Sequence, residues 1–351
     1  MWSNSSGHSN LFGADIEEDI TIHVNREKPE EDVMKKGCIA LLVALVFVTG
    51  SFSTALAKFP TKPIKLIVYT KPGGAIDVFA RKFTTIAAKY TDATFVVVNK
   101  SGAGGIVAIK HILSEKADGY NFAAVTRSNV GKIVSTGNEI NVEDLDWMAL
   151  MVSDPEAIIT SRLLPINTWE QIVADAKEKD GSQIWVGPAA GGNDHIMAMK
   201  TWNAAGIKAK WIPYASGGKA MAALLGGHGV VYVGNPQDVI GRPDLKVAVI
   251  SSPERLTGDF ADVPTFKEVG IEGLDNEILW RGFMAKKGMP DDAKAFYHDL
   301  FDNVNKDAEW QKYIQRGGAV PLFDKEDKFL ATVKNDQKEF AEALKQIGAI
   351  K

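Results

Sequence analysis

The chain contains one local pattern twice: an apolar strand, a glycine-rich turn and an amphipathic helix. The first copy begins at Ile64 and turns through Pro72-Gly73-Gly74, and the second begins at Thr94 and turns through Gly102-Ala103-Gly104-Gly105. Such a turn directs unpaired N–H groups and the positive end of the helix dipole at one point in front of the helix. Phosphate, sulfate and carboxylate groups bind at such points. Two neighbouring copies therefore predict a protein that holds a negatively charged ligand.

Residues 34–57 have the parts of a secretory signal peptide. A basic start at Met34-Lys35-Lys36 precedes an apolar run over 39–48 and the small-x-small sequence Ala55-Leu56-Ala57. The apolar run is too short for a membrane span, which needs about 20 residues. We therefore expect cleavage after Ala57 and a mature chain that starts at Lys58.

Residues 1–33 fit poorly in front of that signal. They carry eight acidic and two basic residues and show no apolar periodicity. Because a signal peptide acts from the true N-terminus, we expect translation to begin at Met34 and the upstream stretch to be a mis-assigned extension. The alternative is a disordered acidic leader in front of a membrane anchor.

The composition of the remaining chain excludes several classes of function. Residues 1–33 hold a net charge of −6 and the signal holds two lysines, so removing both from the overall −4 leaves a formal charge of zero. A neutral chain has no bulk attraction to nucleic acid or to a membrane surface. Cys38, the single cysteine, lies in the expected signal, which leaves no disulfide, thiol nucleophile or cysteine metal site. An exported, cysteine-free chain suggests a bacterial periplasm. We expect a monomer without metal or cofactor.

The chain from Lys58 onward is longer than one hydrophobic core usually supports, so two lobes are expected. Short apolar runs alternate with helical patterns, which indicates an α/β fold with mainly parallel sheets. The apolar stripe of the C-terminal helix, which ends at Ile347, has no third sheet to cover and is expected to return to the first lobe. We therefore expect lobe 1 at 58–157 plus 284–351 and lobe 2 at 158–283, with a ligand cleft between them.

Two other chemistries fit the motifs less well. Lys71-Pro72-Gly73-Gly74 lacks the spacing and final Lys-Ser/Thr of a P-loop, and the second glycine turn lacks the dinucleotide spacing. Asp194-His195 opens a helix beside a glycine loop, but no nucleophile elbow accompanies it. We favour a loop or helix-start role for His195 over that of a general base in a secreted hydrolase.

Three charged residues lie beside the expected anion seat. Asp77 stands in the first turn after the first glycine pair, where a cap of the helix is favoured over a ligand contact. Arg127 follows a strand end. Arg281 lies near the crossover between the lobes and is the best candidate to reach the cleft, where a guanidinium could clamp a carboxylate.

Six ordered motifs together resemble the solute receptors of tripartite tricarboxylate transporters, the Bug-type extracytoplasmic binding proteins. The resemblance covers essentially all of 58–351. The motifs are Lys62-Pro63-Ile64-Lys65-Leu66-Ile67-Val68 leading to Pro72-Gly73-Gly74 and Asp77; Asn99 with Gly102-Ala103-Gly104-Gly105; Asp118-Gly119-Tyr120; Pro213-Tyr214 with Gly217-Gly218; Leu224-Leu225-Gly226-Gly227; and Asp262-Val263-Pro264-Thr265 with Gly270.

The resemblance implies a two-lobed, type II periplasmic-binding-protein fold that closes on a small organic carboxylate. It implies a receptor, not an enzyme, that delivers its ligand to a two-subunit membrane permease driven by an ion gradient. In this family, backbone N–H groups and ordered water of the glycine loops hold the carboxylate. Together with the anion seat and the cations above, the expected ligand-binding residues are Tyr69, Gly73, Gly74, Asp77, Gly104, Arg127, Ser128, Asn129 and Arg281, with Gly191, Asn193 and Asn235 on the facing wall.

Departures from the family pattern suggest a more anionic ligand. Lys71 stands where small or apolar residues are usual, Arg281 replaces an aromatic residue, and Asn235 stands where an acidic residue is frequent. Two added cations and one lost anion favour a di- or tricarboxylate. A receptor for an ABC importer or a sensor kinase remains the main alternative, and neighbouring genes for an ATPase would support it.

Overall fold

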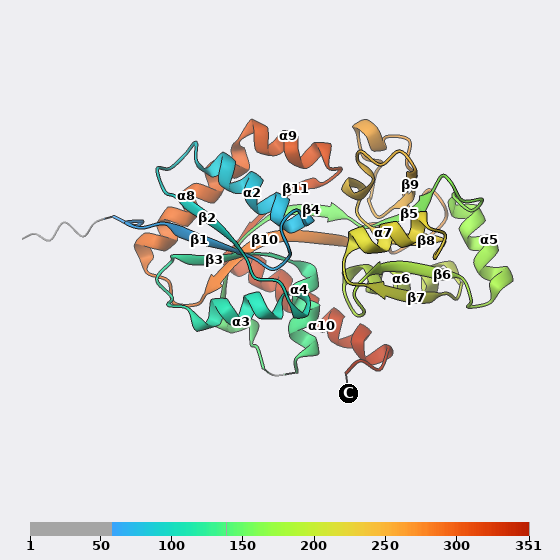
Figure 1. The fold of residues 1–351 in the computed structure, drawn as a ribbon, viewed down its shortest axis with the longest axis horizontal. Coiled ribbons are helices and arrows are strands. Elements are labelled where there is room, and N and C mark those ends of the chain that lie inside the picture. The colour runs from blue at the N-terminus through green and yellow to red at the C-terminus, as the bar shows by residue number, and fades with distance from the viewer. Residues whose placement is uncertain (1–57, 138, 351) are drawn as a thin grey trace, which may run out of the picture. The chain divides into compact units, whose positions relative to one another are not determined.

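The computed structural model describes residues 58–137 and 139–350. The expected signal peptide at 34–57 and the extension at 1–33 lie outside the described residues. Within the described ranges, no helix combines the length and the hydropathy that a membrane span requires. Two β-sheets, both in one compact unit, form the frame of this part of the chain (Figure 1).

The first sheet holds six strands. They are β1 Ile64–Val68, β2 Phe95–Asn99, β3 Asn121–Thr126, β4 Leu145–Pro155, β10 Ile278–Lys286 and β11 Val320–Lys325. Their order across the sheet is β11-β4-β10-β3-β1-β2. Strands β1, β2 and β3 run parallel, as the alternating pattern predicts, whereas β10 is antiparallel to both β3 and β4. The sheet is therefore mixed, because β10, which returns from the second sheet, and β11 run against the other four strands.

Helices cover both faces of the first sheet (Figure 1). They are α2 Ala75–Ala87, α3 Ile106–Ser114, α4 Arg127–Ser135, α8 Asp291–Lys306, α9 Ala308–Arg316 and α10 Glu326–Gln346. Side chains of α2, α8 and α9 form one core with the sheet, and those of α3, α4 and α10 form the other. We call this sheet and its helices lobe 1.

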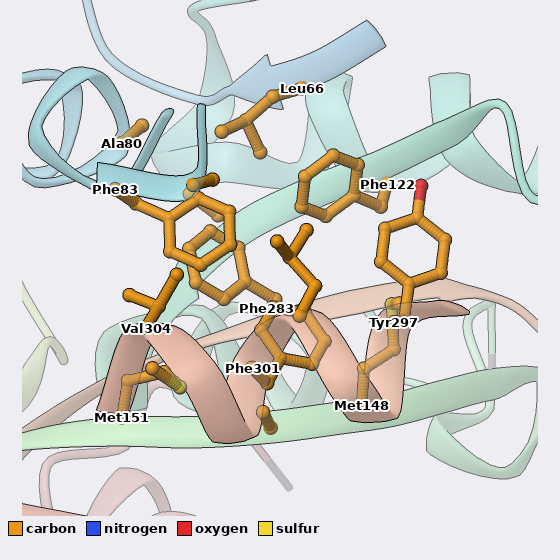
Figure 2. Close-up of a cluster of buried hydrophobic side chains, with 14 of the residues drawn as sticks. Leu66, Ala80, Phe83, Phe122, Met148, Met151, Phe283, Tyr297, Phe301 and Val304 are labelled. Atoms are coloured by element: carbon orange, nitrogen blue, oxygen red, sulfur yellow. The ribbon is translucent and has the colours of Figure 1, made fainter. Parts of the chain in front are cut away.

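Aromatic rings fill the core beneath α2 and α8. The Phe83 and Phe283 rings lie 4.4 Å apart between centroids, and Phe301 stacks on Phe283 at 5.3 Å (Figure 2). All three side chains are fully buried. Because aromatic pairs at these distances add to the free energy gained by burial, this cluster holds α2 and the glycine turn before it firmly on the sheet.

The second sheet holds five strands in the order β7-β6-β8-β5-β9. They are β5 Ala157–Ser161, β6 Ile184–Pro188, β7 Lys210–Tyr214, β8 Val231–Gly234 and β9 Leu245–Ile250. Helices α5 Trp169–Lys179 and α6 Asn193–Ala205 pack on one face, and α7 Gly217–Leu225 packs on the other. We call this sheet and its helices lobe 2.

The chain crosses between the lobes at two adjacent places. Glu156 alone separates β4 from β5, and its N–H donates a hydrogen bond of 2.9 Å to the carbonyl of Glu277, just before β10. Strand β10 pairs along its length with β4 of the first sheet, so the return crossing precedes Ile278 rather than following residue 283. The two crossing segments are thus held side by side.

Helix α10 returns to lobe 1 and packs against α4. Phe329, Val333 and Phe340 are buried in that core, whereas Ile347, at the end of the expected apolar stripe, is 36% exposed. Gly131 of α4 faces the Phe340 ring so closely that a Cβ there would lie 2.5 Å from it. The glycine therefore permits the close approach of the two helices.

Candidate functional site

The first glycine turn carries the start of α2, and Asp77 completes it. Gly73 has a φ of +82°, which favours glycine, and Gly74 is the residue before the helix. The Asp77 carboxylate accepts hydrogen bonds from the Gly73 N–H and Arg81 Nε, both 2.9 Å, and from Asn99 Nδ2 at 2.8 Å. Although burial alone would raise the pKa of Asp77, these bonds hold it below its usual value. The contacts suit a residue that fixes the turn.

The second glycine turn is joined to the start of α4 by Asn129. The Asn129 side chain accepts from the Thr126 N–H at 2.9 Å and donates to the Gly104 carbonyl at 3.0 Å. A Cβ on Gly105 would lie 2.2 Å from Asn129 Nδ2. The amide of Asn129, which is fully buried, is therefore occupied by the fold. It fixes the glycine turn relative to the helix.

Tyr69 and Ser128 lie beside this junction. The Tyr69 hydroxyl is 2.9 Å from Thr126 Oγ1, and burial raises the pKa of this tyrosine. Ser128 is half-buried in the first turn of α4. The first N–H groups of a helix have no partner inside it, so the starts of α2 and α4 offer donors on the same side of lobe 1.

In lobe 2, the turn before α6 is fixed by His195. The Gly191 N–H donates to His195 Nδ1 at 3.0 Å, and the imidazole stacks on Trp211 with ring centroids 4.9 Å apart. Burial and the nearby Lys132 ammonium lower the pKa of His195 to about 4. The ring is thus neutral near pH 7, with Nδ1 engaged as an acceptor. These contacts suit a loop histidine and not a general base.

Asn193 and Asn235 converge on one buried carboxylate. Glu156 Oε1 accepts from Asn193 Nδ2 at 2.6 Å and from Asn235 Nδ2 at 3.3 Å. Burial and the neighbouring Asp194 carboxylate raise the pKa of Glu156 well above its usual value. The structure therefore brings both predicted asparagines together, at the crossing between the lobes.

Both predicted arginines are neutralised within the chain. Arg281, which is 4% exposed, forms an ion pair with Asp154 on the neighbouring strand β4. Arg127 forms an ion pair with Asp336 at 2.8 Å and also contacts Glu339 and Asn193. The pairing with Asp154 already occupies the Arg281 guanidinium within the chain, and a carboxylate clamp at Arg281 stays a prediction.

Sequence reasoning did not identify the buried carboxylates of Asp154 and Glu156, and it considered Asp194 only as the neighbour of His195. Burial and the nearby Asp238 carboxylate raise the pKa of Asp194 to about 7. The run Ser153-Asp154-Pro155-Glu156 at the end of a predicted strand was the available signal, since two acids at a crossing between lobes are unusual in a buried position.

Two cavities lie away from these residues. One of about 230 Å³ is lined by β4, α8 and α10, and one of about 710 Å³ is lined by α4 and α10. Neither is lined by a residue of the predicted ligand set. Across residues 58–137 and 139–350, no group of three or more His, Cys, Asp or Glu is placed to hold a metal ion.

Comparisons with known proteins agree on one family. Residues 79–348 match the family model described as "Tripartite tricarboxylate transporter family receptor". The BugT protein of Bordetella pertussis is 25% identical over 298 residues, which cover 83% of this chain and 91% of BugT.

Solved structures show the same arrangement of the chain. A TctC solute-binding protein from Polaromonas, solved without ligand, is 27% identical, with a TM-score of 0.64 over 82% of this chain and 99% of that protein. An R. palustris protein whose structure contains adipate has a TM-score of 0.74 at 18% identity, over 83% of this chain and 98% of that one. The latter likeness concerns the fold.

Proposed function

Because the chain belongs to the receptor family of the tripartite tricarboxylate transporters, we propose that it captures a small organic carboxylate outside the cytoplasm for a two-subunit membrane permease. Members of this family are periplasmic solute-binding receptors and not enzymes. The observation that carries the proposal is the family match over residues 79–348. The arrangement of the glycine turns at the starts of α2, α4 and α6 supports it.

The proposed seat is the set of helix starts that face the crossing between the lobes. Gly73 and Gly74 precede α2, Gly104 is tied to α4, and Gly191 precedes α6. Since Asp77, Asn129 and His195 are engaged in fixing these turns, the ligand contacts are proposed to come mainly from backbone N–H groups and from Tyr69 and Ser128. Helix starts attract carboxylates without a salt bridge.

The ligand class we propose is a di- or tricarboxylate. Its support is the related R. palustris structure that contains adipate, a dicarboxylate. Arg281 no longer contributes to this argument, because its charge is paired with Asp154. Of the two cations that this sequence adds to the family pattern, Lys71 still supports the proposed ligand class, because it is exposed beside the first glycine turn.

We further propose that the chain reaches the periplasm through cleavage after Ala57 and acts there as a monomer. Family members are periplasmic, which agrees with the signal-peptide pattern of 34–57. N-terminal sequencing of the exported protein is expected to give Lys58-Phe59-Pro60. A sequence that begins at Met1 or Met34 would contradict the cleavage.

A thermal-shift screen tests the binding function. The purified protein is heated with malate, adipate, citrate, acetate and neutral sugars, and a bound ligand at 100 times its Kd stabilises the folded state by about 2.7 kcal/mol. We expect a di- or tricarboxylate to raise the melting temperature. Stabilisation by sugars alone would contradict the proposal.

The variant Gly74→Val tests whether the ligand binds at the glycine turn before α2. A Cβ on Gly74 would already lie 2.8 Å from Thr70 Oγ1, so a branched side chain has to displace the turn at the start of α2. Gly218→Val is the control on lobe 2, because a Cβ at Gly218 meets nothing within 4 Å. We expect the ligand-dependent shift to be lost in Gly74→Val and kept in Gly218→Val.

A further inference from the structure

Four charged side chains form a closed ring across the two lobes. Arg127 lies 2.5 Å from Glu339, Glu339 forms an ion pair with Lys200, Lys200 lies 2.7 Å from Glu277, and Glu277 lies 3.8 Å from Arg127. The signs alternate around the ring. Each carboxylate therefore contacts one arginine and one lysine, and removal of any member leaves two neighbours of like charge with one shared partner instead of two.

The members come from elements that belong to different lobes. Arg127 begins α4 and Glu339 lies on α10, both in lobe 1, whereas Lys200 lies on α6 in lobe 2. Glu277 stands in the return crossing just before β10. The ring can therefore form only when α6 lies against α4 and α10.

Burial separates this ring from ordinary surface ion pairs. The side chains of Arg127 and Glu277 are 7% and 15% exposed, and those of Glu339 and Lys200 are 26% and 31% exposed. Burial alone would raise the pKa of Glu339, but Arg127 and Lys200 hold it below its usual value. Partly buried charges interact more strongly than exposed ones and are screened less by salt.

The ring also fixes Asn193, the first residue of α6, whose start belongs to the proposed ligand seat. Arg127 Nη1 donates to Asn193 Oδ1 at 2.9 Å, and Asn193 Nδ2 donates to Glu156 Oε1 at 2.6 Å. The amide of Asn193 is thus held in one orientation, with its oxygen toward lobe 1 and its nitrogen toward the crossing. A displaced Arg127 would release that orientation.

A second contact lies beside the ring and depends on the same placement of the lobes. Lys132 Nζ of α4 donates to the carbonyl of Ala190, in the turn before α6, at 2.7 Å. Leu344 of α10 is so near Gly191 that a Cβ there would lie 2.6 Å from its methyl group. The turn before α6 is therefore in direct contact with lobe 1.

We propose that Arg127, Lys200, Glu277 and Glu339 form an interlobe clasp, which holds the lobes together and fixes Asn193 and, with it, the start of α6 in the proposed ligand seat. Lys200 is the member that joins lobe 2 to both carboxylates. Its loss weakens closure without disturbing the core of either lobe. The effect of the clasp on ligand binding rests on the proposed function, whereas its effect on the closure of the lobes does not.

Spin-label distances test closure directly. Cys38, the only cysteine of the chain, lies in the expected signal, so Lys110→Cys on α3 and Glu178→Cys on α5 place one label on each lobe of the mature chain, at exposed positions. Lys200→Met breaks the clasp, Lys200→Arg restores its charge, and Lys208→Met removes an exposed lysine of lobe 2 that pairs with Asp180. We expect Lys200→Met to change and broaden the distance distribution, and the other two variants to match the parent.

Ionic strength and ligand supply two further readouts. Raising salt to about 1 M, where the screening length falls to about 3 Å, is expected to change the parent distribution only part of the way toward that of Lys200→Met, because the ring is partly buried. Malate or citrate is expected to bind Lys200→Met about 3- to 10-fold more weakly than the parent, with Lys200→Arg intermediate or equal to the parent.

The outcomes separate the two proposals. An unchanged distance distribution in Lys200→Met, at both low and high salt, overturns the clasp. If no carboxylate binds even the parent protein, the proposed function fails while the distances still decide the clasp. Equal affinity in Lys200→Met and the parent overturns the positioning of Asn193.

Discussion

Arg127 Nη1 donates a hydrogen bond of 2.9 Å to Asn193 Oδ1 and so joins the first residue of α4 in lobe 1 to the first residue of α6 in lobe 2. The sequence suggested that both side chains bind the ligand. In the structure their polar atoms are bound to each other and to carboxylates of the chain. The side chains therefore fix the starts of α4 and α6, whose backbone N–H groups we propose as donors to the ligand.

Replacement of Arg127 is expected to lower the free energy of unfolding. Arg127→Met leaves Asp336 and Glu339 without their main partner in a buried position, and breaking a buried pair in this way costs about 3–5 kcal/mol. Urea unfolding measures this loss. Arg255→Met is the control, because its pair with Glu268 is exposed and is expected to contribute less than about 1 kcal/mol.

The contact between α4 and α10 gives a second prediction. Gly131→Ala places a methyl group 2.5 Å from the Phe340 ring, so we expect a destabilisation of about 1–3 kcal/mol as the helices move apart. Gly218→Ala in α7 is the matched control. Its added methyl group meets nothing within 4 Å, and alanine favours a helix, so a neutral or stabilising effect is expected. Equal effects of the two substitutions would contradict the role of Gly131.

Local patterns in the sequence predict most of the helices and strands, but they do not predict α4. The residues Arg127–Ser135 include two serines and Gly131, which are poor helix formers, so the sequence alone showed no helix signal after the strand. The helix is stabilised by packing on α10, a segment far along the chain. Strand β11, with its Pro321, was missed for the same kind of reason, since it pairs only with β4.

The positions of candidate site residues were easier to predict than their partners. Arg281 lies in β10, shortly after the return crossing, and its pairing with Asp154 depends on the antiparallel register of β10 and β4, which aligns Arg281 with Val152 and Leu279 with Asp154. No local pattern specifies that register. The repeated strand–turn–helix pattern led to the two glycine turns of lobe 1, whereas the burial of the carboxylates of Glu156 and Asp194 required the three-dimensional structure.

Asp194 gives a pH-dependent prediction. Its pKa is about 7 in the folded state and near 3.8 in the unfolded state, so the folded protein binds the extra proton between these values. Stability from this group is therefore present below pH 3.8 and is lost as the pH rises to about 7. One pKa unit corresponds to about 1.4 kcal/mol. The free energy of unfolding of Asp194→Asn, relative to that of the parent, is therefore expected to be higher at pH 8 than at pH 4 by on the order of a few kcal/mol.

Chemical unfolding of the parent and Asp194→Asn at pH 4, 6 and 8 checks this sign. The difference in the free energy of unfolding is expected to shift in favour of the variant as the pH rises. A difference that is independent of pH, or that shifts toward the parent, would show that Asp194 is ionised without penalty.

Asp77 has the opposite dependence. Its pKa is lowered in the folded state, so its contribution to stability is present above pH 3.8 and is lost as the pH falls below that value. Asp77→Asn is expected to cost about 1–2 kcal/mol at pH 7 and less at pH 3, through weaker bonds to Gly73 and Arg81. An equal cost at both pH values in thermal unfolding would contradict the role of the carboxylate in the turn.

Isothermal titration of the purified protein with a carboxylate and with its methyl ester tests the central claim most directly. The account predicts that malate, adipate or citrate binds once per chain, and that the corresponding ester, which lacks the negative charges, does not bind measurably. Equal binding of the acid and its ester would contradict a site built from helix starts, and binding of neutral ligands alone would contradict a carboxylate receptor.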